Sequence, residues 1–381
     1  MPGPQHPAEP NRVEHNRTEL DPPPNNAAIP AQADVPPERS AQRRADDPDI
    51  TERIDALIAD MGGTPGTFSA RLVRDLIATG LKLIPDGRDT GELKLITSSV
   101  KELRYAYRIF GQHPEPHKVT IFGSARTPVG HPDYDAAVDF SRLMAAEGWM
   151  VITGAGGGIM EAGHVGPGRE KSFGVAIRLP FETTANQVIA GDQKLIHFRY
   201  FFTRKLMFLS QAEAVALFPG GFGTMDEAYE ALTLIQTGKS SMIPIVLLEG
   251  AQQNYWEQWD RWVKDALLAR GLISPEDIGL YKICHSSGEA VAHILKFYRI
   301  YHSSRYVQDD LVIRLKRPIS DADVARLEEE FRPLIKSGGM SLRKAYDVED
   351  DHLDLPRLAF THTRSRFGLV RKLIDRLNEC E

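Results

Sequence analysis

The stretch ALFPGGFGTMDEAYEAL, from Ala216 to Leu232, contains the turn that decides the fold. An apolar run ends at Pro219, a glycine-rich turn follows it, and a helix-like pattern begins at once. Glycines let backbone amides approach phosphate oxygens closely, and the positive end of the following helix favours an anion at the same place. The stretch therefore predicts a strand–loop–helix unit that binds phosphate.

The glycine-rich turns do not match the common nucleotide motifs. A P-loop requires a lysine and a hydroxyl after its glycines, whereas TMD follows here, at 224–226. The turn GAGGG at 154–158 has Ile159 in place of the third glycine of a dinucleotide fingerprint, and it follows the second predicted strand instead of the first. These differences argue against a P-loop and against a nicotinamide or flavin site.

The region 118–304 alternates strand-like runs with helix-like segments. KVTIF at 118–122, MVIT at 150–153 and AVALF at 214–218 are largely apolar without alternation. Such runs are typical of strands in a parallel sheet that is covered on both faces. We therefore expect an α/β fold, a Rossmann-like doubly wound parallel sheet.

The rest of the chain differs from this central region. Residues 1–48 hold almost no large apolar side chains, so we expect a disordered tail. Residues 49–112 contain three amphipathic segments and predict a helical extension, while 305–381 predict a small α+β appendage. The appendage either covers apolar surface on the core or acts as a regulatory module.

Composition excludes several classes of protein. A net charge of −6 argues against general affinity for nucleic acid. The two cysteines, Cys284 and Cys380, argue against a disulfide framework, and neither has a second ligand at the spacing of a structural zinc site. No segment resembles a signal peptide or a membrane span, so we expect a cytoplasmic protein without membrane partners, metal or cofactor.

Three glycine turns follow predicted strands, and ligands of doubly wound folds bind at the carboxyl ends of the strands. Each turn alone is explained equally well as a tight strand–helix junction that binds nothing. Three together favour a ligand. The candidate binding residues are Gly123, Ser124, Gly156, Gly157, Gly158, Gly220, Gly221, Gly223 and Thr224.

Glu227 is the candidate catalytic carboxylate. Together with Thr224 it has the spacing of a capping box, which would explain both residues without any function. The functional interpretation is that the positive helix end keeps the carboxylate ionised, as a general base or a stabiliser of developing positive charge requires. Phosphate on the glycines would turn that carboxylate toward the sugar, where cleavage of an N-glycosidic bond forms an oxocarbenium-like centre.

Arg204 and Lys205 are adjacent cations at the start of an otherwise apolar helix. They either lie on a solvated face and pair with carboxylates, or they serve a site. In the second case the planar fork of Arg204 would hold the leaving base or the phosphate, and Lys205 would act electrostatically or structurally.

These motifs together resemble the Lonely Guy (LOG) family, whose members were often labelled "possible lysine decarboxylase". The matching segments are FGSA at 122–125, GAGGGIMEA at 154–162, FTRK at 202–205 and PGGFGTMDE at 219–227. The resemblance covers about 118–304. It implies a phosphoribohydrolase that splits nucleoside 5′-monophosphates into free base and ribose 5-phosphate, assembled as a homodimer or a higher homo-oligomer.

The resemblance also implies roles for individual residues. Glu227 and Arg204 match the catalytic pair, Gly220, Gly221, Gly223 and Thr224 match the phosphate loop, and 156–158 match the second glycine turn. Phe202-Thr203 and Glu161 differ from the short plant-type members and, with the long extensions, resemble the longer bacterial branch. This favours AMP-like substrates over cytokinin riboside monophosphates, with Glu161 and Lys205 as further candidate binding residues.

Two other functions compete with hydrolysis as interpretations of these motifs. A pyridoxal-phosphate decarboxylase needs a Schiff-base lysine, and no motif places Lys205 or Lys239 in that role. A non-catalytic nucleotide or molybdenum-cofactor carrier of the same superfamily is the alternative. Because a carrier needs neither Glu227 nor Arg204, the presence of both favours the enzyme.

Overall fold

The computed structural model describes residues 47–115, 117–178 and 185–380. The chain divides into two compact units, Met1–Leu93 and Lys94–Glu381. The tail expected over residues 1–48 falls outside the described residues except for its last two positions, and the first helix begins at Pro48.

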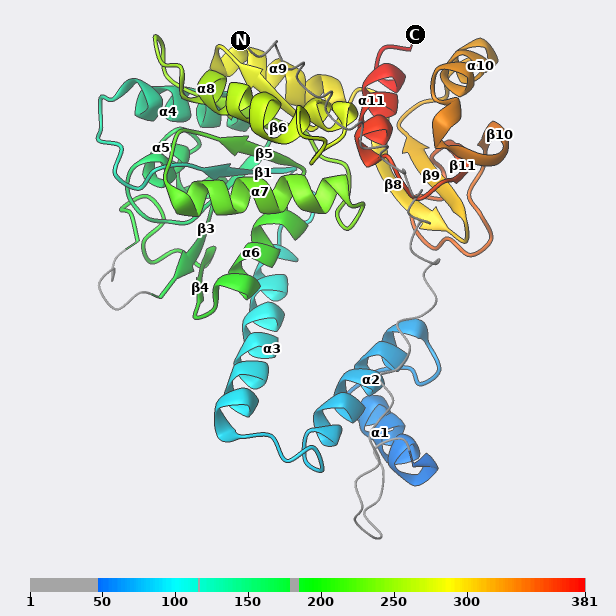
Figure 1. The fold of residues 1–381 in the computed structure, drawn as a ribbon. Coiled ribbons are helices and arrows are strands. Elements are labelled where there is room, and N and C mark those ends of the chain that lie inside the picture. The colour runs from blue at the N-terminus through cyan, green and yellow to red at the C-terminus, as the bar shows by residue number, and fades with distance from the viewer. Residues whose placement is uncertain (1–46, 116, 179–184, 381) are drawn as a thin grey trace, which may run out of the picture. The chain divides into compact units, whose positions relative to one another are not determined.

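The described part of the first unit contains a helical hairpin. Its helices are α1 (Pro48–Asp60) and α2 (Phe68–Lys82) (Figure 1). Asp47 and Thr67 cap their N-termini by accepting hydrogen bonds from backbone amides two and three residues ahead. Ile54 is buried in the small apolar cluster between the two helices, which accounts for the amphipathic pattern of the sequence.

The second unit is built on a seven-stranded, all-parallel sheet with the order β4-β3-β2-β1-β5-β6-β7. This confirms the expected Rossmann-like α/β fold. Four of its strands are buried along their whole length, as their apolar sequences predict. The strands are β1 (Lys118–Phe122), β2 (Met150–Thr153), β3 (Ser172–Ile177), β4 (Leu195–Phe198), β5 (Ala214–Leu217), β6 (Ile245–Leu248) and β7 (Tyr281–Cys284).

Helices cover both faces of this sheet (Figure 1). On one face α4 packs against α5 and α9. The helix α3 (Thr90–Phe110) begins at the division between the units, and its last residue, Phe110, is buried and stacks on Phe173 at 4.5 Å between ring centroids. The other helices around the sheet are α4 (Pro132–Ala146), α5 (Ile159–Val165), α6 (Phe201–Ser210), α7 (Phe222–Gln236), α8 (Tyr255–Trp262) and α9 (Ser287–Phe297).

The strand order reverses between β1 and β5, and this switch point positions the site. The carboxyl ends of the two strands are tied together, since the Phe218 amide donates to the Phe122 carbonyl at 2.8 Å and the Ser124 amide to the Pro219 carbonyl at 3.0 Å. The first and third glycine turns of the sequence are therefore neighbours in space.

The C-terminal part folds as a four-stranded antiparallel sheet with two helices. The boundary expected after Ser304 falls inside its first strand, because the chain leaves α9 at Phe297 and becomes extended instead of continuing as a helix to His302. The sheet has the order β10-β11-β9-β8. Its elements are β8 (Tyr301–Val307), β9 (Asp310–Leu315), α10 (Asp321–Glu330), β10 (Ile335–Arg343), β11 (Arg357–His362) and α11 (Phe367–Leu377).

A buried ion cluster holds the inner strands of this appendage to the loop before β11. Arg314 and Arg357 both pair with Glu349, at 2.7 and 3.2 Å, and Asp351 pairs with Arg314. The side chains of Arg357 and Glu349 are fully buried. Because each charge has an opposite partner, the cluster is tolerated in an apolar setting.

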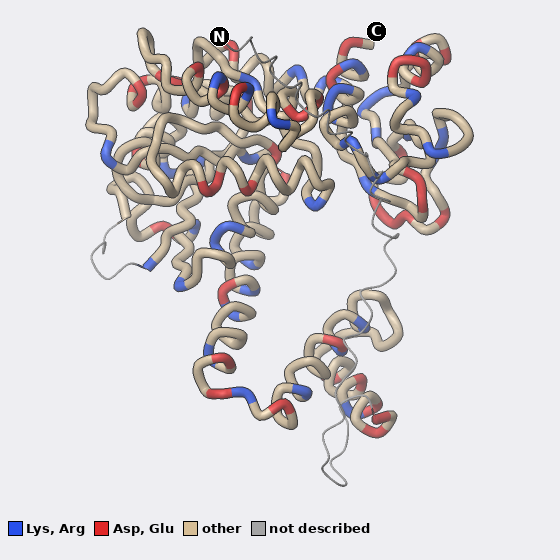
Figure 2. Tube along the Cα trace, in the orientation of Figure 1, with Lys and Arg blue, Asp and Glu red and all other residues tan. Residues whose placement is uncertain are grey.

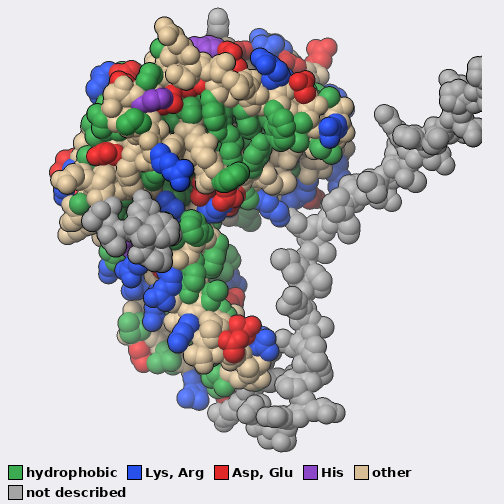
Figure 3. Space-filling model, turned by 60° about the vertical axis from the view of Figure 1, so that its left-hand side comes forward, with side chains coloured by type: hydrophobic (Ala, Val, Ile, Leu, Met, Phe, Trp, Pro, Cys, Tyr) green, Lys and Arg blue, Asp and Glu red, His purple; other side chains and the backbone are tan. Residues whose placement is uncertain are grey.

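The surface of the molecule is charged and mixed. Acidic and basic positions interleave along the helices (Figure 2), and on the face shown in Figure 3 hydrophobic side chains gather across the larger unit. Among the described residues, no helix is both long enough and apolar enough to cross a bilayer.

Candidate active site

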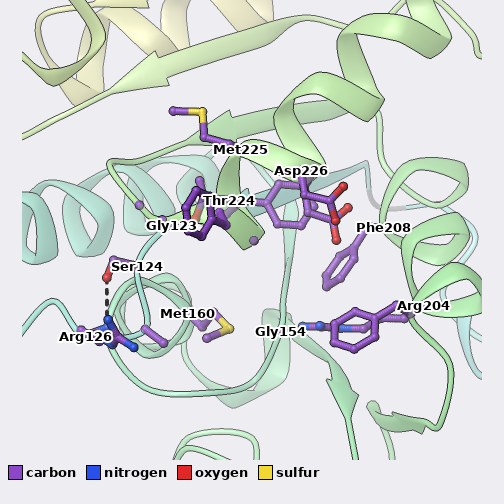
Figure 4. A pocket seen from close by; sticks show the side chains of 18 of the residues that line it. Gly123, Ser124, Arg126, Gly154, Met160, Arg204, Phe208, Thr224, Met225 and Asp226 are labelled. Carbon is purple, nitrogen blue, oxygen red and sulfur yellow. Dashed lines mark hydrogen bonds between the residues drawn. The ribbon is translucent and has the colours of Figure 1, made fainter. Parts of the chain in front are cut away.

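A cavity of about 710 Å³ opens at the carboxyl ends of β1 and β5 (Figure 4). Eight of the residues expected from the sequence line it. They are Gly123, Ser124, Arg204, Gly220, Gly221, Gly223, Thr224 and Glu227. The other five expected residues, Gly156, Gly157, Gly158, Glu161 and Lys205, are not among its lining residues.

The turn after β5 presents the amino end of α7 to the cavity. A Cβ at Gly220 would lie 2.1 Å from the Thr224 hydroxyl, so only glycine fits where the chain folds back on the helix. The helix begins at Phe222 with Gly221 as its N-cap and has no side-chain cap. Its first amides are therefore available to an anion.

The capping box, the alternative explanation for Thr224 and Glu227, does not form. Thr224 and Glu227 both lie inside α7, because the helix starts two residues before Thr224. Neither side chain therefore caps the helix, so helix capping does not explain why Glu227 stands at this position.

The second glycine turn, after β2, packs against the turn that follows β1. Gly158 has φ +62°, and a Cβ there would lie 2.3 Å from the Ser124 carbonyl oxygen. The Ile159 amide donates to that same oxygen at 3.0 Å. The side-chain amide of Asn186 donates to the carbonyls of Ala155 and Gly156 at 3.1 and 3.0 Å. Residues 156–158 of this turn position Ser124 without lining the cavity themselves.

Replacing Gly158 by alanine is expected to destabilise the protein by about 1–3 kcal/mol, because the new methyl group meets backbone and the left-handed conformation is strained. Gly157→Ala is the matched control, since the nearest atom to its Cβ is 3.6 Å away. Chemical unfolding of both variants measures the difference. Equal loss in the two variants would contradict the close packing of Gly158 on Ser124.

Glu227 is buried at the floor of the cavity, with its side chain carried by the first turns of α7. Its Oε2 atom has no hydrogen-bond partner among the described residues. Burial raises the pKa of Glu227 to about 7, and the positive charges of Lys205 and Arg204 offset only part of that effect. The expectation of a fully ionised carboxylate was therefore wrong: near pH 7 both forms are populated.

Arg204 reaches the cavity from α6. Its Nε donates to the Val175 carbonyl at 2.9 Å, and its guanidinium lies 5.1 Å from the centre of the Phe208 ring. A Cβ at Gly154 would be 2.5 Å from Nη2, so this glycine leaves room for the guanidinium. The arginine is held in place while its outer edge lines the cavity.

Lys205 has a structural position. It joins α6 to α7 through ion pairs with Asp226 at 2.8 Å and with Glu230 at 2.5 Å. Burial acts to lower its pKa, but the hydrogen bonds to the two carboxylates outweigh burial and raise it. A lysine held charged in this way is unsuited to forming a Schiff base.

The sequence did not single out most of the apolar and aromatic lining. The hydroxyl of Tyr255, from α8, donates a hydrogen bond to the Gly220 carbonyl at 2.6 Å and thereby stabilises the glycine turn after β5. Phe122, Met160, Phe222 and Met225 stand within the motifs of the sequence, although none of them was named as a site residue. The further lining residues are Phe122, Ala125, Arg126, Gly154, Met160, Phe201, Phe208, Phe222, Met225, Asp226 and Tyr255.

No group of three or more metal-ligating side chains occurs among the residues that the structure describes. The lining combines the first amides of α7 with Arg204, Arg126 and the buried carboxyl group of Glu227. Arg126 and Arg204 lie on opposite sides of the view in Figure 4. Such a donor set suits a phosphorylated organic ligand.

Comparison with solved structures finds similar folds in part of the chain. The Moco carrier protein from Chlamydomonas reinhardtii is 18% identical, with 48% of this chain and 97% of that chain covered and a TM-score of 0.33. The molybdenum cofactor binding protein from Rippkaea orientalis is 22% identical over 47% of this chain and 95% of that chain, with a TM-score of 0.32. DNA processing protein A from Helicobacter pylori is 12% identical over 50% and 83%, with a TM-score of 0.31.

Comparison of sequences is more specific. No curated protein matches the chain, but residues 155–294 match the model of a family described as "Possible lysine decarboxylase". The matched segment contains Arg204, the glycine turn after β5 and Glu227. This match confirms, over residues 155–294 of the Rossmann-like domain, the resemblance to the "possible lysine decarboxylase" family that the motifs predicted.

Proposed function

We propose that the Rossmann-like domain hydrolyses the N-glycosidic bond of AMP-like nucleoside 5′-monophosphates, releasing the free base and ribose 5-phosphate. The observation that carries this proposal is the buried carboxyl group of Glu227, whose Oε2 has no partner among the described residues. It lies on the same helix whose free amino end faces the cavity. The amino end of α7 can thus bind a phosphate while Glu227, on the same helix, acts on the sugar.

The phosphate would bind at the amino end of α7. There the free amides and the helix dipole attract an anion, and the Ser124 hydroxyl and Arg126 line the same cavity. The cavity volume of about 710 Å³ suits a whole nucleoside monophosphate. Phe208 and the other aromatic residues of the lining offer flat apolar surfaces to a planar base.

Hydrolysis requires charge stabilisation on both sides of the breaking bond. When the bond from C1′ to the base nitrogen breaks, its electron pair leaves with the base, and positive charge develops on the ribose. The Glu227 carboxylate stabilises that charge and accepts the proton of the attacking water, whose oxygen bonds to C1′. Arg204 stabilises the electron pair on the departing base by hydrogen bonding, and the base finally takes up one proton.

The activity should depend on pH through Glu227. The ionised form is the active one, and burial raises the pKa of this group to about 7. We therefore expect kcat/KM for AMP to rise with pH up to about 7 and to level off above it. Initial rates across buffers of constant ionic strength measure the profile. A flat profile from pH 5.5 to 9 would contradict the role of Glu227 as the base.

Chromatography tests the proposed reaction. The protein is incubated with AMP, GMP, CMP, isopentenyl-AMP and adenosine, and free base and ribose 5-phosphate are quantified. We expect cleavage of AMP, and at least about 100-fold lower kcat/KM for adenosine, because the nucleoside lacks the phosphate that the helix amides hold. Recovery of every nucleotide intact, with tight binding of AMP or of a phosphorylated pterin, would favour the carrier alternative.

A further inference from the structure

The helix α6 carries Arg204 but receives no cap from its own segment. Its N-cap residue, Tyr200, forms no side-chain cap hydrogen bond, and its first turn contains no acidic residue. Arg204 and Lys205 also place two positive charges near a helix end that is already positive. A negative group from elsewhere in the fold would therefore stabilise this first turn.

Glu102, on α3, supplies that negative group. One of its carboxylate oxygens accepts a hydrogen bond from the Arg199 amide at 2.9 Å, and the other accepts one from the Thr203 hydroxyl at 2.8 Å. These partners are 97 and 101 residues away in the sequence, and α3 lies beside the start of α6 (Figure 1). A single carboxylate thus bridges the residue before the N-cap and the first turn of the helix.

The bridge depends on a buried hydroxyl group. Thr203 is completely buried, so its hydroxyl needs an acceptor within the protein. The Tyr200 carbonyl is a second acceptor at 3.0 Å, but a carboxylate is the stronger of the two. The hydrogen bond from Thr203 to Glu102 therefore fixes the first turn of α6 against α3.

The strand β3 connects α3 to Arg204 by a second route. Phe110, the last residue of α3, stacks on Phe173 of β3 at 4.5 Å between ring centroids. Two residues further along this strand, the Val175 carbonyl accepts the hydrogen bond from Nε of Arg204 at 2.9 Å. The helix α3 thus contacts both the strand that holds the guanidinium and the helix that carries it.

Loss of the Glu102 bridge would act on Arg204 through the first turn of α6. The amides of a first turn have no acceptor within their own helix, so an uncapped helix end frays. The guanidinium is held at β3, so a shift of the Arg204 backbone pulls it away from the Val175 carbonyl. A misplacement of about 1 Å can cost a catalytic group roughly 100-fold in rate.

We propose that Glu102 is a positioning residue for Arg204. It fixes the first turn of α6 and, through it, the guanidinium that stabilises the departing base. This inference rests on the proposed function. It also makes α3, a helix outside the motifs of the sequence, a support of the active site.

Glu102→Ala and Thr203→Val each remove one side of the bridge, and kinetics of the full chain test them. We expect kcat for AMP to fall about 10- to 100-fold, with KM within about twofold because the α7 amides still hold the phosphate. With 4-nitrophenyl riboside 5′-phosphate, whose leaving group carries its electron pair without help from an arginine, kcat should fall less than about threefold. Equal losses with both substrates would overturn the proposal.

Three further variants serve as controls. Thr203→Ser keeps the hydroxyl group and should retain kcat within about threefold of the wild type. Lys101→Ala removes a charged side chain from an exposed position of α3 and should behave like the wild type. In a chain that already carries Arg204→Ala, adding Glu102→Ala should cause no further loss of kcat, and a full additional loss there would contradict action through Arg204.

The Nε–H signal of Arg204 in ¹⁵N-edited NMR spectra tests the inference without turnover, because this proton is bonded to the Val175 carbonyl. Its absence from Arg204→Ala assigns it. We expect exchange with solvent to be at least about tenfold faster in Glu102→Ala than in the wild type or Thr203→Ser.

The two measurements separate the two proposals. Faster exchange in Glu102→Ala, in a protein that cleaves no nucleotide, would support the positioning of Arg204 and contradict the proposed hydrolysis. Cleavage of AMP by the wild type, with unchanged exchange and unchanged kcat in Glu102→Ala, would support hydrolysis and overturn the role of Glu102.

Discussion

Glu227→Gln is expected to lower kcat for AMP by about 10²–10⁴, the usual contribution of a positioned base. Glutamine keeps the size of the side chain but can neither accept a proton nor carry the negative charge that stabilises the ribosyl centre. Since glutamine does not disturb the helix amides, KM should change little. Steady-state kinetics of AMP cleavage provide both constants.

The same substitution should make the protein more stable in mild alkali. The pKa of Glu227 is raised from its ordinary value to about 7, so the folded state favours the protonated form. That stabilisation is complete below the unfolded pKa and is lost as pH rises through about 7. At pH 8 the neutral glutamine removes a penalty of about 3 kcal/mol, which thermal unfolding at pH 5 and pH 8 would reveal.

Glu230→Gln is the control for both measurements. Glu230 lies on the same helix and pairs with Lys205, but it does not line the cavity. It should retain activity within a few-fold. Loss of activity in Glu230→Gln as large as in Glu227→Gln would mean that the electrostatics of the helix, and not the carboxyl group of Glu227, sustain the reaction.

Glu349→Ala is expected to destabilise the appendage by about 3–5 kcal/mol, because it leaves Arg357 buried without its carboxylate partner. Burial alone would raise the pKa of Glu349, but the Tyr346 amide and the two arginines outweigh it and lower the pKa to about 2. The stabilisation is therefore complete above the ordinary pKa near 4.5 and is lost as pH falls toward 2. Calorimetry at pH 7 and pH 3 measures both effects.

A surface pair in the same appendage provides the comparison. Glu330 pairs with Arg376 at 3.1 Å, and both side chains are largely exposed. Glu330→Ala should cost far less stability than Glu349→Ala, because solvent screens an exposed pair. If the two alanine variants lost equal stability at pH 7, the buried cluster would have no special role in holding β9 and β11 to the loop before them.

The sequence predicted the fold class because its strands are buried on both faces. An apolar run without alternation can be recognised from neighbouring residues alone, and it predicts a strand that is buried on both faces. Two elements have no such local signal. The short β4 leads directly into the helical pattern of α6, and the first residues of β8 continue the apolar pattern of α9. In both cases pairing with a distant strand decides the conformation, and pairing is not a local property.

The site was predictable as far as its motifs extend along the chain. Arg204, Glu227 and the glycine turns after β1 and β5 have local signatures and line the cavity, whereas Gly156, Gly157 and Gly158 do not line it. The capping box was wrong because a one- or two-residue shift of a helix start cannot be derived from the spacing alone. Tyr255 and the raised pKa of Glu227 depend on the packing of elements far apart in sequence, so no local pattern indicates them.

A crystal structure of Glu227→Gln with AMP tests the central claim most directly, since the variant binds substrate but turns it over slowly. The expected result is a phosphate on the backbone amides at 221–224, with C1′ of the ribose facing residue 227 and the base on the side of Arg204 and Phe208. A phosphate bound elsewhere, or a ribose whose C1′ faces away from residue 227, would contradict the assignment of this cavity to cleavage of the N-glycosidic bond.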